Sequence, residues 1–479
     1  MDITEVEVGL ETFGVEHQRP TVKRLCFDKI VVRVVQVSQV DDRGNEVGVK
    51  EQSLAIGHAR SFAVSLATFI HQKGGDAILR PLTGHERTLA LGLPPGAARL
   101  ALLFFVPARA PAGDRYLDTL VKLRVAKKEG KRSKEGGLEH VPFRIWLPEG
   151  VKTIRGVTFN PFYTRAVTQK HWQAACRQWG FGILAANFFG AKNDEIPAMI
   201  DTALAAFAKE SSHEELVGAK LCPLGMSSGA GMSTRIAEHL PGRTIAVGPV
   251  CLEVGPRDAK SMEIPMLTVC GDRDGRQYEK LMARLPQARA QGGRFGIAPQ
   301  WNRKHEFARA NNLLMPLFDA AIRVRLGAPG EPLKPFAEKD GWLGDVSGWK
   351  EGGSEIAPFG KYAGDPAKAC WLPDAKTAAA WLAFVTWRPT LKLKSPPGLG
   401  DGQPFIPRKV GEAIEVEVAG MPETKGVIEV WAGAERLGEL SGGALTVQFS
   451  RPGFYPVYLQ GKSSDGSILR SRPNTLVVQ

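Results

Sequence analysis

The residues that could most clearly carry out chemistry form the pentapeptide at 225–229, with the sequence GMSSG. It comes directly after an apolar run at 219–224 and directly before a stretch of helical character at 231–239. A nucleophilic serine on such a strand-to-helix turn has a strained backbone, and glycines are expected on either side because side chains there would collide with neighbouring elements. The pattern therefore predicts that Ser227 is a nucleophile.

A histidine downstream of this serine is required, because a serine hydroxyl is a weak nucleophile until an imidazole takes its proton. Of the nine histidines in the chain, only His239 and His305 follow Ser227. His239 ends the expected helix, where a role at the helix C-terminus is natural. His305 follows the last expected strand, at 294–298, and precedes the closing helix. We therefore predict that His305 is the general base.

An acid must also hold the imidazole in the correct orientation. Asp272 and Asp274 follow the apolar run at 266–269, so both are expected at the carboxyl end of a strand, where catalytic groups of open α/β sheets gather. Only one of them can orient a single ring, and we expect Asp274. Asp272 is an alternative, as is Glu253 after the preceding strand, and the same composition also suits a solvated turn without function.

The elements around these residues alternate between apolar runs and helical stretches. This alternation predicts an α/β fold with a mostly parallel, doubly wound sheet over 142–326. Strands are expected at 143–147, 156–159, 182–187, 219–224, 244–250, 266–269 and 294–298, and helices at 169–179, 195–209, 231–239 and 308–326.

With nucleophile, acid and base in this chain order, the region 142–326 resembles serine esterases of the α/β-hydrolase fold. The resemblance rests on the pentapeptide at 225–229, on the segment from Pro265 to Asp274, and on His305. It implies hydrolysis of a carboxylic ester through an acyl-enzyme, with no cofactor and no metal. A narrower resemblance, to extracellular bacterial esterases that act on plant or polyester material, comes from the β-rich C-terminal region.

The resemblance also implies an oxyanion hole. In this family one donor is the backbone N–H of the residue after the nucleophile, here Ser228, and the second comes from the loop after the third strand. That loop, at 160–163, has the sequence NPFY and departs from the usual His-Gly type. Because Pro161 has no N–H to donate, the second donor is expected to be Phe162 or Tyr163.

Residues 1–112 are the least regular part of the chain. Beyond a strand expected at 30–37 they show no sustained period, and we assign them no activity. Within them, 99–112 combine a positive flank, an apolar run and an A-x-A pattern, as a signal peptide does. Either the reading frame is over-extended and the protein is exported to the periplasm or beyond, or this segment is a buried strand and the protein is cytoplasmic.

Three further regions are expected outside the catalytic domain. A basic linker is predicted at 113–141, an irregular connector packed on the catalytic domain by its tryptophans at 327–400, and a β-sandwich at 401–479. We expect removal of this sandwich to leave the turnover of soluble esters largely intact. Its candidate core residues are Trp431, Phe449 and Tyr458.

Composition excludes several other classes of function. The net charge of +12 comes partly from a basic cluster at 122–134 that lacks interleaved aromatic residues, so a solvated segment is favoured over nucleic-acid binding. The 6 cysteines are scattered without ligand spacing, which predicts buried free thiols and neither zinc site nor disulfide scaffold. No apolar run reaches the roughly 20 residues of a membrane span. Glycine-rich nucleotide loops are missing as well.

The sequence thus favours hydrolysis of a small-molecule or polymer ester. Peptidase or thioesterase chemistry would use the same three residues. A non-catalytic protein that binds carbohydrate or a partner on a hydrolase scaffold is the alternative from another class, and the unusual loop at 160–163 favours it. The acyl group, the alcohol group and the oligomeric state are left open.

Overall fold

The computed structural model of the chain divides into two compact units, Met1–Ala112 and Gly113–Gln479. In the first unit the structure describes only the backbone of its strands. In the second it describes residues 113–122, 140–188, 193–349, 354–387, 389, 391–394, 407–419 and 426–479.

The first unit contains two antiparallel sheets of three strands each. β2 covers the strand expected at 30–37, and β6 covers part of the apolar run in the signal-like segment. The remainder of that segment, including its A-x-A pattern, lies outside the described residues. The strands are β1 (Thr4–Gly9), β2 (Ile30–Val37), β3 (Val49–Ile56), β4 (Asp76–Pro81), β5 (Glu86–Gly92) and β6 (Ala101–Phe105).

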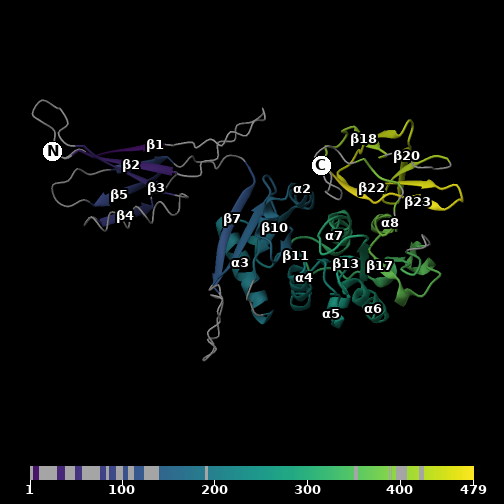
Figure 1. Ribbon diagram of the computed structural model, residues 1–479. Coiled ribbons are helices and arrows are strands. Elements are labelled where there is room, and N and C mark those ends of the chain that lie inside the picture. Colours follow the sequence, from purple (N-terminus) through teal and green to yellow (C-terminus); the bar gives the residue numbers. More distant parts are fainter. Residues whose placement is uncertain are drawn as a thin grey trace, which may run out of the picture. The chain divides into compact units, whose positions relative to one another are not determined.

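The second unit is built on a sheet of eight strands in the order β14-β13-β12-β11-β9-β10-β8-β7 (Figure 1). The strands β9 to β14 run parallel, whereas β8 is antiparallel to β10 and β7 is antiparallel to β8, so the fold is a mixed α/β fold with a mostly parallel sheet. These strands are β7 (Arg115–Lys122), β8 (His140–Leu147), β9 (Gly156–Asn160), β10 (Phe181–Ala186), β11 (Lys220–Met226), β12 (Gly248–Val250), β13 (Met266–Gly271) and β14 (Phe295–Gln300).

The strand β7 corrects the linker predicted for 113–141. It pairs with β8 from Arg115 opposite Leu147 to Lys122 opposite His140, and so forms the edge of the sheet. Only Val121 of this strand is fully buried, which leaves a weak apolar alternation in the sequence. The lysine-rich remainder, 123–139, lies outside the described residues.

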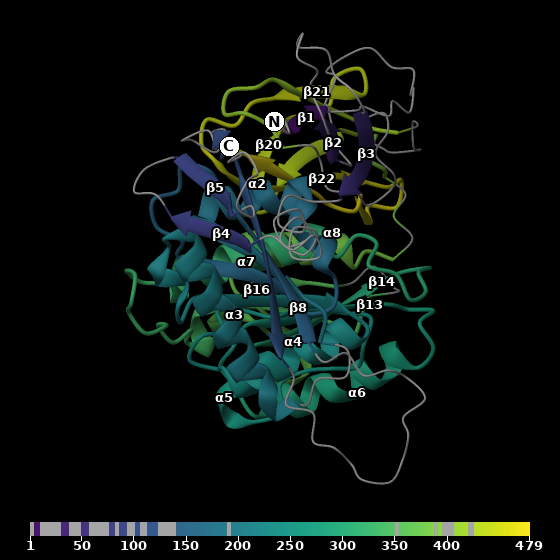
Figure 2. The same ribbon diagram turned by 90° about the vertical axis from the view of Figure 1, so that its left-hand side faces the viewer.

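Helices cover both sides of this sheet (Figures 1 and 2). The helices α2 and α7 contact one another on one side, and α3, α4, α5 and α6 lie on the other. Their bounds are α2 (Lys170–Trp179), α3 (Ile196–Ser211), α4 (Ser228–His239), α5 (Ala259–Met262), α6 (Gln277–Ala290) and α7 (Asn311–Arg325), with short 3-10 turns at η1 (Thr164–Thr168), η2 (Asn193–Glu195) and η3 (Glu214–Leu216).

The connector at 327–400 is more regular than expected. Trp342 and Trp387 are partly buried, whereas Trp371 is 1% exposed and the buried Trp381 donates its indole N–H to Ile297 O of β14 at 2.7 Å. The rings of Trp371 and Trp381 are therefore packing groups and are not available to stack on a sugar. The elements are η4 (Glu338–Asp340), β15 (Trp342–Gly344), β16 (Ile356–Pro358), η5 (Phe359–Lys361), η6 (Pro366–Lys368), β17 (Cys370–Leu372) and α8 (Ala375–Phe384).

The C-terminal region forms two antiparallel sheets, β18-β21 and β20-β19-β22-β23, with β24 also paired to β22. The two sheets share one apolar core. Of the expected core residues, Phe449 belongs to it, Tyr458 is buried outside it, and Trp431 is only half-buried because Val430 and Ala432 occupy the core face instead. The strands are β18 (Ile414–Glu417), β19 (Glu429–Ala432), β20 (Glu435–Glu439), β21 (Ala444–Val447), β22 (Gly453–Lys462), β23 (Ile468–Arg470) and β24 (Asn474–Val478).

This C-terminal region packs directly on α2 and α7. Phe454 of β22 stacks on Trp179 of α2 with ring centroids 4.9 Å apart. Thr475 of β24 donates its backbone N–H to Asn312 Oδ1 at 2.8 Å and its hydroxyl to the Asn312 carbonyl at 2.7 Å. Because Phe454 belongs to the core of the main sheet, removing the region would also remove part of that core, and its effect on the turnover of soluble esters stays a prediction.

We expect Phe454→Ala to destabilise the whole second unit. The side chain is fully buried, so its loss should cost about 3–5 kcal/mol of unfolding free energy. The measurement is denaturant unfolding followed by tryptophan fluorescence. Ile468→Ala, which removes a half-exposed side chain of β23, is the control and should change little. A C-terminal region that unfolds in a separate transition, with the rest unaffected, would contradict the shared core.

Candidate active site

Ser227 lies on a sharp turn between β11 and α4, as the sequence pattern predicts. Its backbone has φ 57° and ψ −121°, a region that non-glycine residues rarely adopt and that costs about 1–3 kcal/mol. The surrounding structure holds it there: Ser227 N–H donates to Val250 O at 2.9 Å, and Ser227 O accepts from Ala230 N–H at 2.9 Å. Strain of this kind is typical of a functional residue.

The two glycines of the pentapeptide differ in whether the turn requires glycine at their positions. A Cβ on Gly225 would lie 2.7 Å from the backbone carbonyl of Gly229, so the turn can close only with glycine at 225. A Cβ on Gly229 would meet nothing nearer than Phe162, at 3.9 Å, which is ordinary van der Waals contact. The collision expected on both sides of Ser227 therefore holds for Gly225 alone.

His305 and Asp274 are brought together at the carboxyl ends of β14 and β13. The His305 Nδ1 atom lies 2.9 Å from each oxygen of the Asp274 carboxylate. Asp274 is 11% exposed at its side chain and His305 is 43% exposed. Because a carboxylate only accepts, this contact places the proton of the neutral ring on Nδ1 and leaves Nε2 as the acceptor.

The alternative acids have other partners. Asp272 Oδ1 accepts from the backbone N–H of Arg303 at 3.3 Å, and this contact helps to hold the loop before His305. Glu253 pairs with Lys280 of α6 at 2.7 Å. The loop approaches β13 so closely that a Cβ on Gly271 would lie 2.3 Å from the carbonyl oxygen of Arg303. Asp274 is thus the carboxylate that faces the ring.

The Ser227 hydroxyl and the His305 ring share no hydrogen bond in the described part of the chain. The two are separated by the end of β12: Ser227 bonds Val250, and the next residue, Cys251, has its Sγ within 4.8 Å of ligand atoms of both Asp274 and His305. In enzymes without substrate the serine–histidine contact is commonly longer than in the reacting complex.

Cys251 is a residue of this site that the sequence did not single out. It has φ 56°, is fully buried, and donates its thiol to Glu306 O at 3.1 Å. Burial raises the pKa of the Cys251 thiol to about 11, and the Asp274 carboxylate adds to the rise, so the thiol is protonated at neutral pH. The available signal was its position directly after the strand expected at 244–250.

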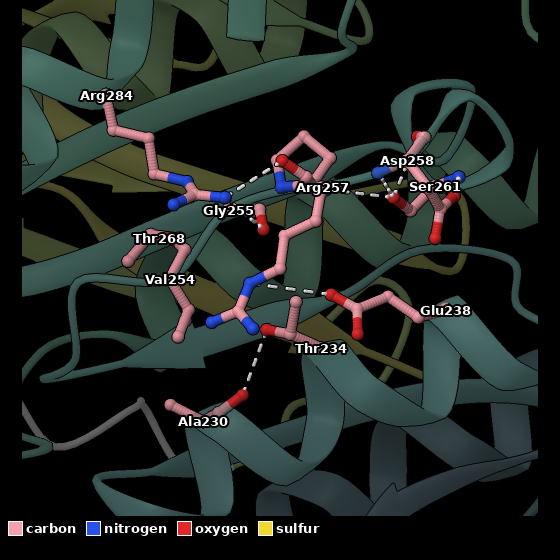
Figure 3. A network of polar contacts seen from close by, with 11 residues as sticks. Ala230, Thr234, Glu238, Val254, Gly255, Arg257, Asp258, Ser261, Thr268 and Arg284 are labelled. Carbon is pink, nitrogen blue, oxygen red and sulfur yellow. Dashed lines mark hydrogen bonds and ion pairs between the residues drawn. The ribbon is translucent and has the colours of Figure 1, made fainter. Parts of the chain in front are cut away.

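A polar network fixes the segment that follows Cys251 (Figure 3). Thr268 of β13 donates its hydroxyl to Val254 O at 2.9 Å, and Arg284 of α6 donates to Gly255 O at 3.3 Å and to Pro256 O at 3.1 Å. Asp258 then caps α5 by accepting from the backbone N–H of Ser261 at 2.7 Å (Figure 3). Side chains of β13 and α6 therefore hold the backbone of 254–256, the segment that follows Cys251.

The expected oxyanion-hole donors differ in whether their backbone N–H groups have an acceptor. Ser228 begins α4, and its N–H has no acceptor among the described residues, as expected in the first turn of a helix. Phe162 donates its N–H to Asn160 Oδ1 at 3.3 Å, whereas the N–H of Tyr163 has no acceptor within the described part of the chain. The loop lies against the turn, because Phe162 is the nearest side chain to Gly229.

The other histidines near this sheet have structural positions. His239 is the last residue of α4, as expected. His171 of α2 is partly buried, and its Nε2 lies 3.1 Å from Asn311 Nδ2. Burial lowers the pKa of His171 to about 4, so it is neutral at physiological pH.

Comparisons with known proteins place the chain only loosely. No family model matches the chain, and neither does any curated protein. Among solved structures, it is similar to a feruloyl esterase module from Clostridium thermocellum at 10% identity and a TM-score of 0.30, over 44% of this chain and 88% of that one. A predicted CIB-like hydrolase from Thermoplasma acidophilum matches at 13% identity and a TM-score of 0.28, over 43% and 98% of the two chains.

A third similar structure contains fibronectin(III)-like modules of Clostridium thermocellum CbhA, at 15% identity and a TM-score of 0.16, over 18% of this chain and 93% of that one. Likenesses of this size assign neither a family nor a substrate. The case for function therefore rests on the geometry of the site. In the described residues, no helix is both long and apolar enough to cross a membrane.

Proposed function

We propose that the chain is a serine hydrolase of the α/β-hydrolase fold that cleaves a carboxylic ester, with Ser227, His305 and Asp274 as its triad. The observation that carries the proposal is the combination of a strained serine between β11 and α4 with a histidine–carboxylate pair at the ends of β14 and β13. Serine rarely adopts such a backbone without a functional reason, and a carboxylate on Nδ1 is the partner that a histidine base requires.

In the first half of the reaction, Ser227 Oγ attacks the carbonyl carbon of the ester while its proton passes to Nε2 of His305. The imidazolium that forms is stabilised by Asp274, which is only 11% exposed. The carbonyl oxygen becomes an oxyanion, which we expect the N–H groups of Ser228 and of Tyr163 or Phe162 to bind. Tyr163 is the better candidate, because its N–H has no acceptor in the described residues.

In the second half, the C–O bond to the alcohol breaks and the alcohol leaves with the proton from His305. A water molecule then gives a proton to His305 and attacks the acyl-serine; the acyl–Oγ bond breaks, the acid is released, and His305 passes the proton to Ser227. His305 is 43% exposed, so solvent and a bulky substrate can reach this base. This exposure supports a plant-polysaccharide or polyester ester as substrate class.

A binding protein on the same scaffold remains the second candidate, because Ser227 Oγ and His305 are not hydrogen-bonded. A serine without an activating base does not react with acyl or phosphoryl groups at a useful rate. The two functions therefore differ in whether Ser227 is chemically reactive.

Labelling with a fluorophosphonate probe distinguishes them. We expect the folded wild type to be labelled at one serine, and peptide mass spectrometry should place the label on Ser227. Ser227→Ala should not react, whereas Ser233→Ala should, because that buried hydroxyl of the same helix donates to Gly229 O and cannot reach the probe. A wild type that stays unlabelled, or a label on another serine, would overturn the proposed function. With labelling shown, nitrophenyl, acetylated-xylan and feruloyl esters would define the acyl group.

A further inference from the structure

Three side chains with metal-binding atoms meet at the carboxyl edge of the sheet. Cys251 follows β12, Asp274 follows β13 and His305 follows β14, and one ligand atom of each lies within 4.8 Å of the other two. Sulfur, carboxylate oxygen and imidazole nitrogen are the donors that bind Zn²⁺ in proteins. Since the three ligands come from three separate strand ends, the spacing of cysteines and histidines along the chain could not show this cluster.

We propose that Cys251, Asp274 and His305 form a Zn²⁺ site whose occupation switches the hydrolase off. Zinc bonds to such atoms at about 2.0–2.3 Å and takes four ligands in a tetrahedron, so three protein atoms and one water complete the set. Ligand atoms in that geometry are about 3–4 Å apart, so the three side chains need to move by only about 1 Å.

The cluster is built to hold an ion in place. Cys251 is fixed by its backbone N–H bond to Val269 O at 2.8 Å and by the network of Figure 3. Asp274 is fixed in a turn, because its N–H donates to Gly271 O at 3.3 Å and its carbonyl accepts from Gln277 N–H at 3.1 Å. The half-exposed His305 provides both the route from solvent and the freedom to adjust. The backbones of two ligands are fixed and the side chain of the third is exposed, which suits reversible binding.

The charge of the site suits a divalent cation. When Zn²⁺ binds, the Cys251 thiol must release its proton to solvent, and the resulting thiolate, the Asp274 carboxylate and a neutral imidazole bring two negative charges, which Zn²⁺ neutralises. The ion would also engage the two residues that the proposed mechanism uses to accept and stabilise a proton. Inhibition therefore rests on the proposed function, whereas zinc binding rests only on the positions of the three side chains.

Binding is measured first, without reference to activity. Full-length protein freed of metal by chelator is dialysed against ZnCl₂ and its zinc content determined, and Co²⁺ is added separately to detect a thiolate-to-cobalt absorption band. We expect one Zn²⁺ per chain and a cobalt band in the wild type. Cys251→Ser, which keeps a donor for Glu306 O, should weaken zinc binding at least about tenfold and remove the band.

Matched variants keep the result interpretable. Cys222→Ala removes a buried thiol of β11 outside the cluster and should bind zinc as the wild type does. His305→Gln alters a half-exposed side chain, so it is expected to fold even if Cys251→Ser does not, and it should weaken zinc binding as well. Stoichiometric zinc that is insensitive to both the Cys251 and the His305 variants, or no bound zinc at all, overturns the site.

Inhibition is measured second, as ester hydrolysis against free Zn²⁺ and its recovery with chelator. Loss of activity with the same half-point as binding supports the switch. Full activity of the zinc-loaded wild type would leave the metal site standing and overturn the roles given to His305 and Asp274. Failure of the metal-free protein to hydrolyse any ester would overturn the proposed function, and the binding experiment would still decide the site.

Discussion

Ser227→Ala should reduce ester turnover by about 10⁵–10⁶-fold, because loss of the nucleophile costs nearly the whole catalytic contribution of a triad. The fold should not suffer, since no hydrogen bond of the Ser227 hydroxyl to another described residue is found in the structure. Steady-state kinetics on a nitrophenyl ester, together with denaturant unfolding, measures both effects. A residual rate within tenfold of the wild type would contradict nucleophilic catalysis by this residue.

Ser227→Gly sharpens this experiment, because it is equally inactive but relieves the backbone. At φ 57° the backbone of residue 227 is strained for serine and alanine but not for glycine. The glycine variant should therefore be more stable than the alanine variant by about 1 kcal/mol. Two inactive variants that differ in stability in this direction would tie the strain to the turn. Equal stability would show that the turn relaxes.

Asp274→Asn should lower turnover by about 10⁴-fold and leave the protein folded. An asparagine can present its amide N–H₂ to His305 Nδ1, which moves the ring proton to Nε2 and removes the acceptor that Ser227 needs. The carboxylate that stabilises the imidazolium is lost at the same time. The measurement is kcat/KM for the same ester as a function of pH.

Asp272→Asn is the matched control, since the two aspartates are separated by one residue on the same turn. The Asp272 carboxylate accepts a long hydrogen bond from Arg303 N–H, at 3.3 Å, which an asparagine oxygen can also accept. Its effect on turnover should be within about tenfold. The reverse ranking of the two variants would mean that Asp272 orients the ring during catalysis, and the assignment of Asp274 would fail.

The sequence allowed prediction of features that depend on local chemistry. The strand-to-helix turn at Ser227 follows from five consecutive residues, and the strands β9, β13 and β14 lie within two residues of their expected bounds because buried parallel strands are continuous apolar runs. The candidates for the acid that orients His305 could also be limited to carboxylates that follow a strand. Choosing among them required the turn at 271–275, whose direction no pattern of apolar residues reveals.

Features that depend on distant contacts were missed. The helix α6 contains Pro286 and buries little besides Leu281 and Leu285, so its apolar period is weak. The edge strand β7 has only one fully buried side chain. Cys251 is part of the site only because Asp274 and His305, which follow two other strands, lie close to it. In each case the structure of the segment depends on the elements that it packs against, which its own sequence does not reveal.

The packing of β22 and β24 on α2 has a consequence for the order in which this protein folds. Gln479 donates its side-chain N–H to Ala174 O at 2.8 Å, across 305 residues of chain, and Phe454 meets Trp179 across a similar span. During synthesis α2 emerges long before β22 and β24, so the part of its apolar face that these strands cover is exposed to solvent in the meantime. Contacts of such long sequence separation are slow to form. The nascent chain therefore passes through a stage in which the sheet is present while the face of α2 around Trp179 is a target for chaperones or for aggregation.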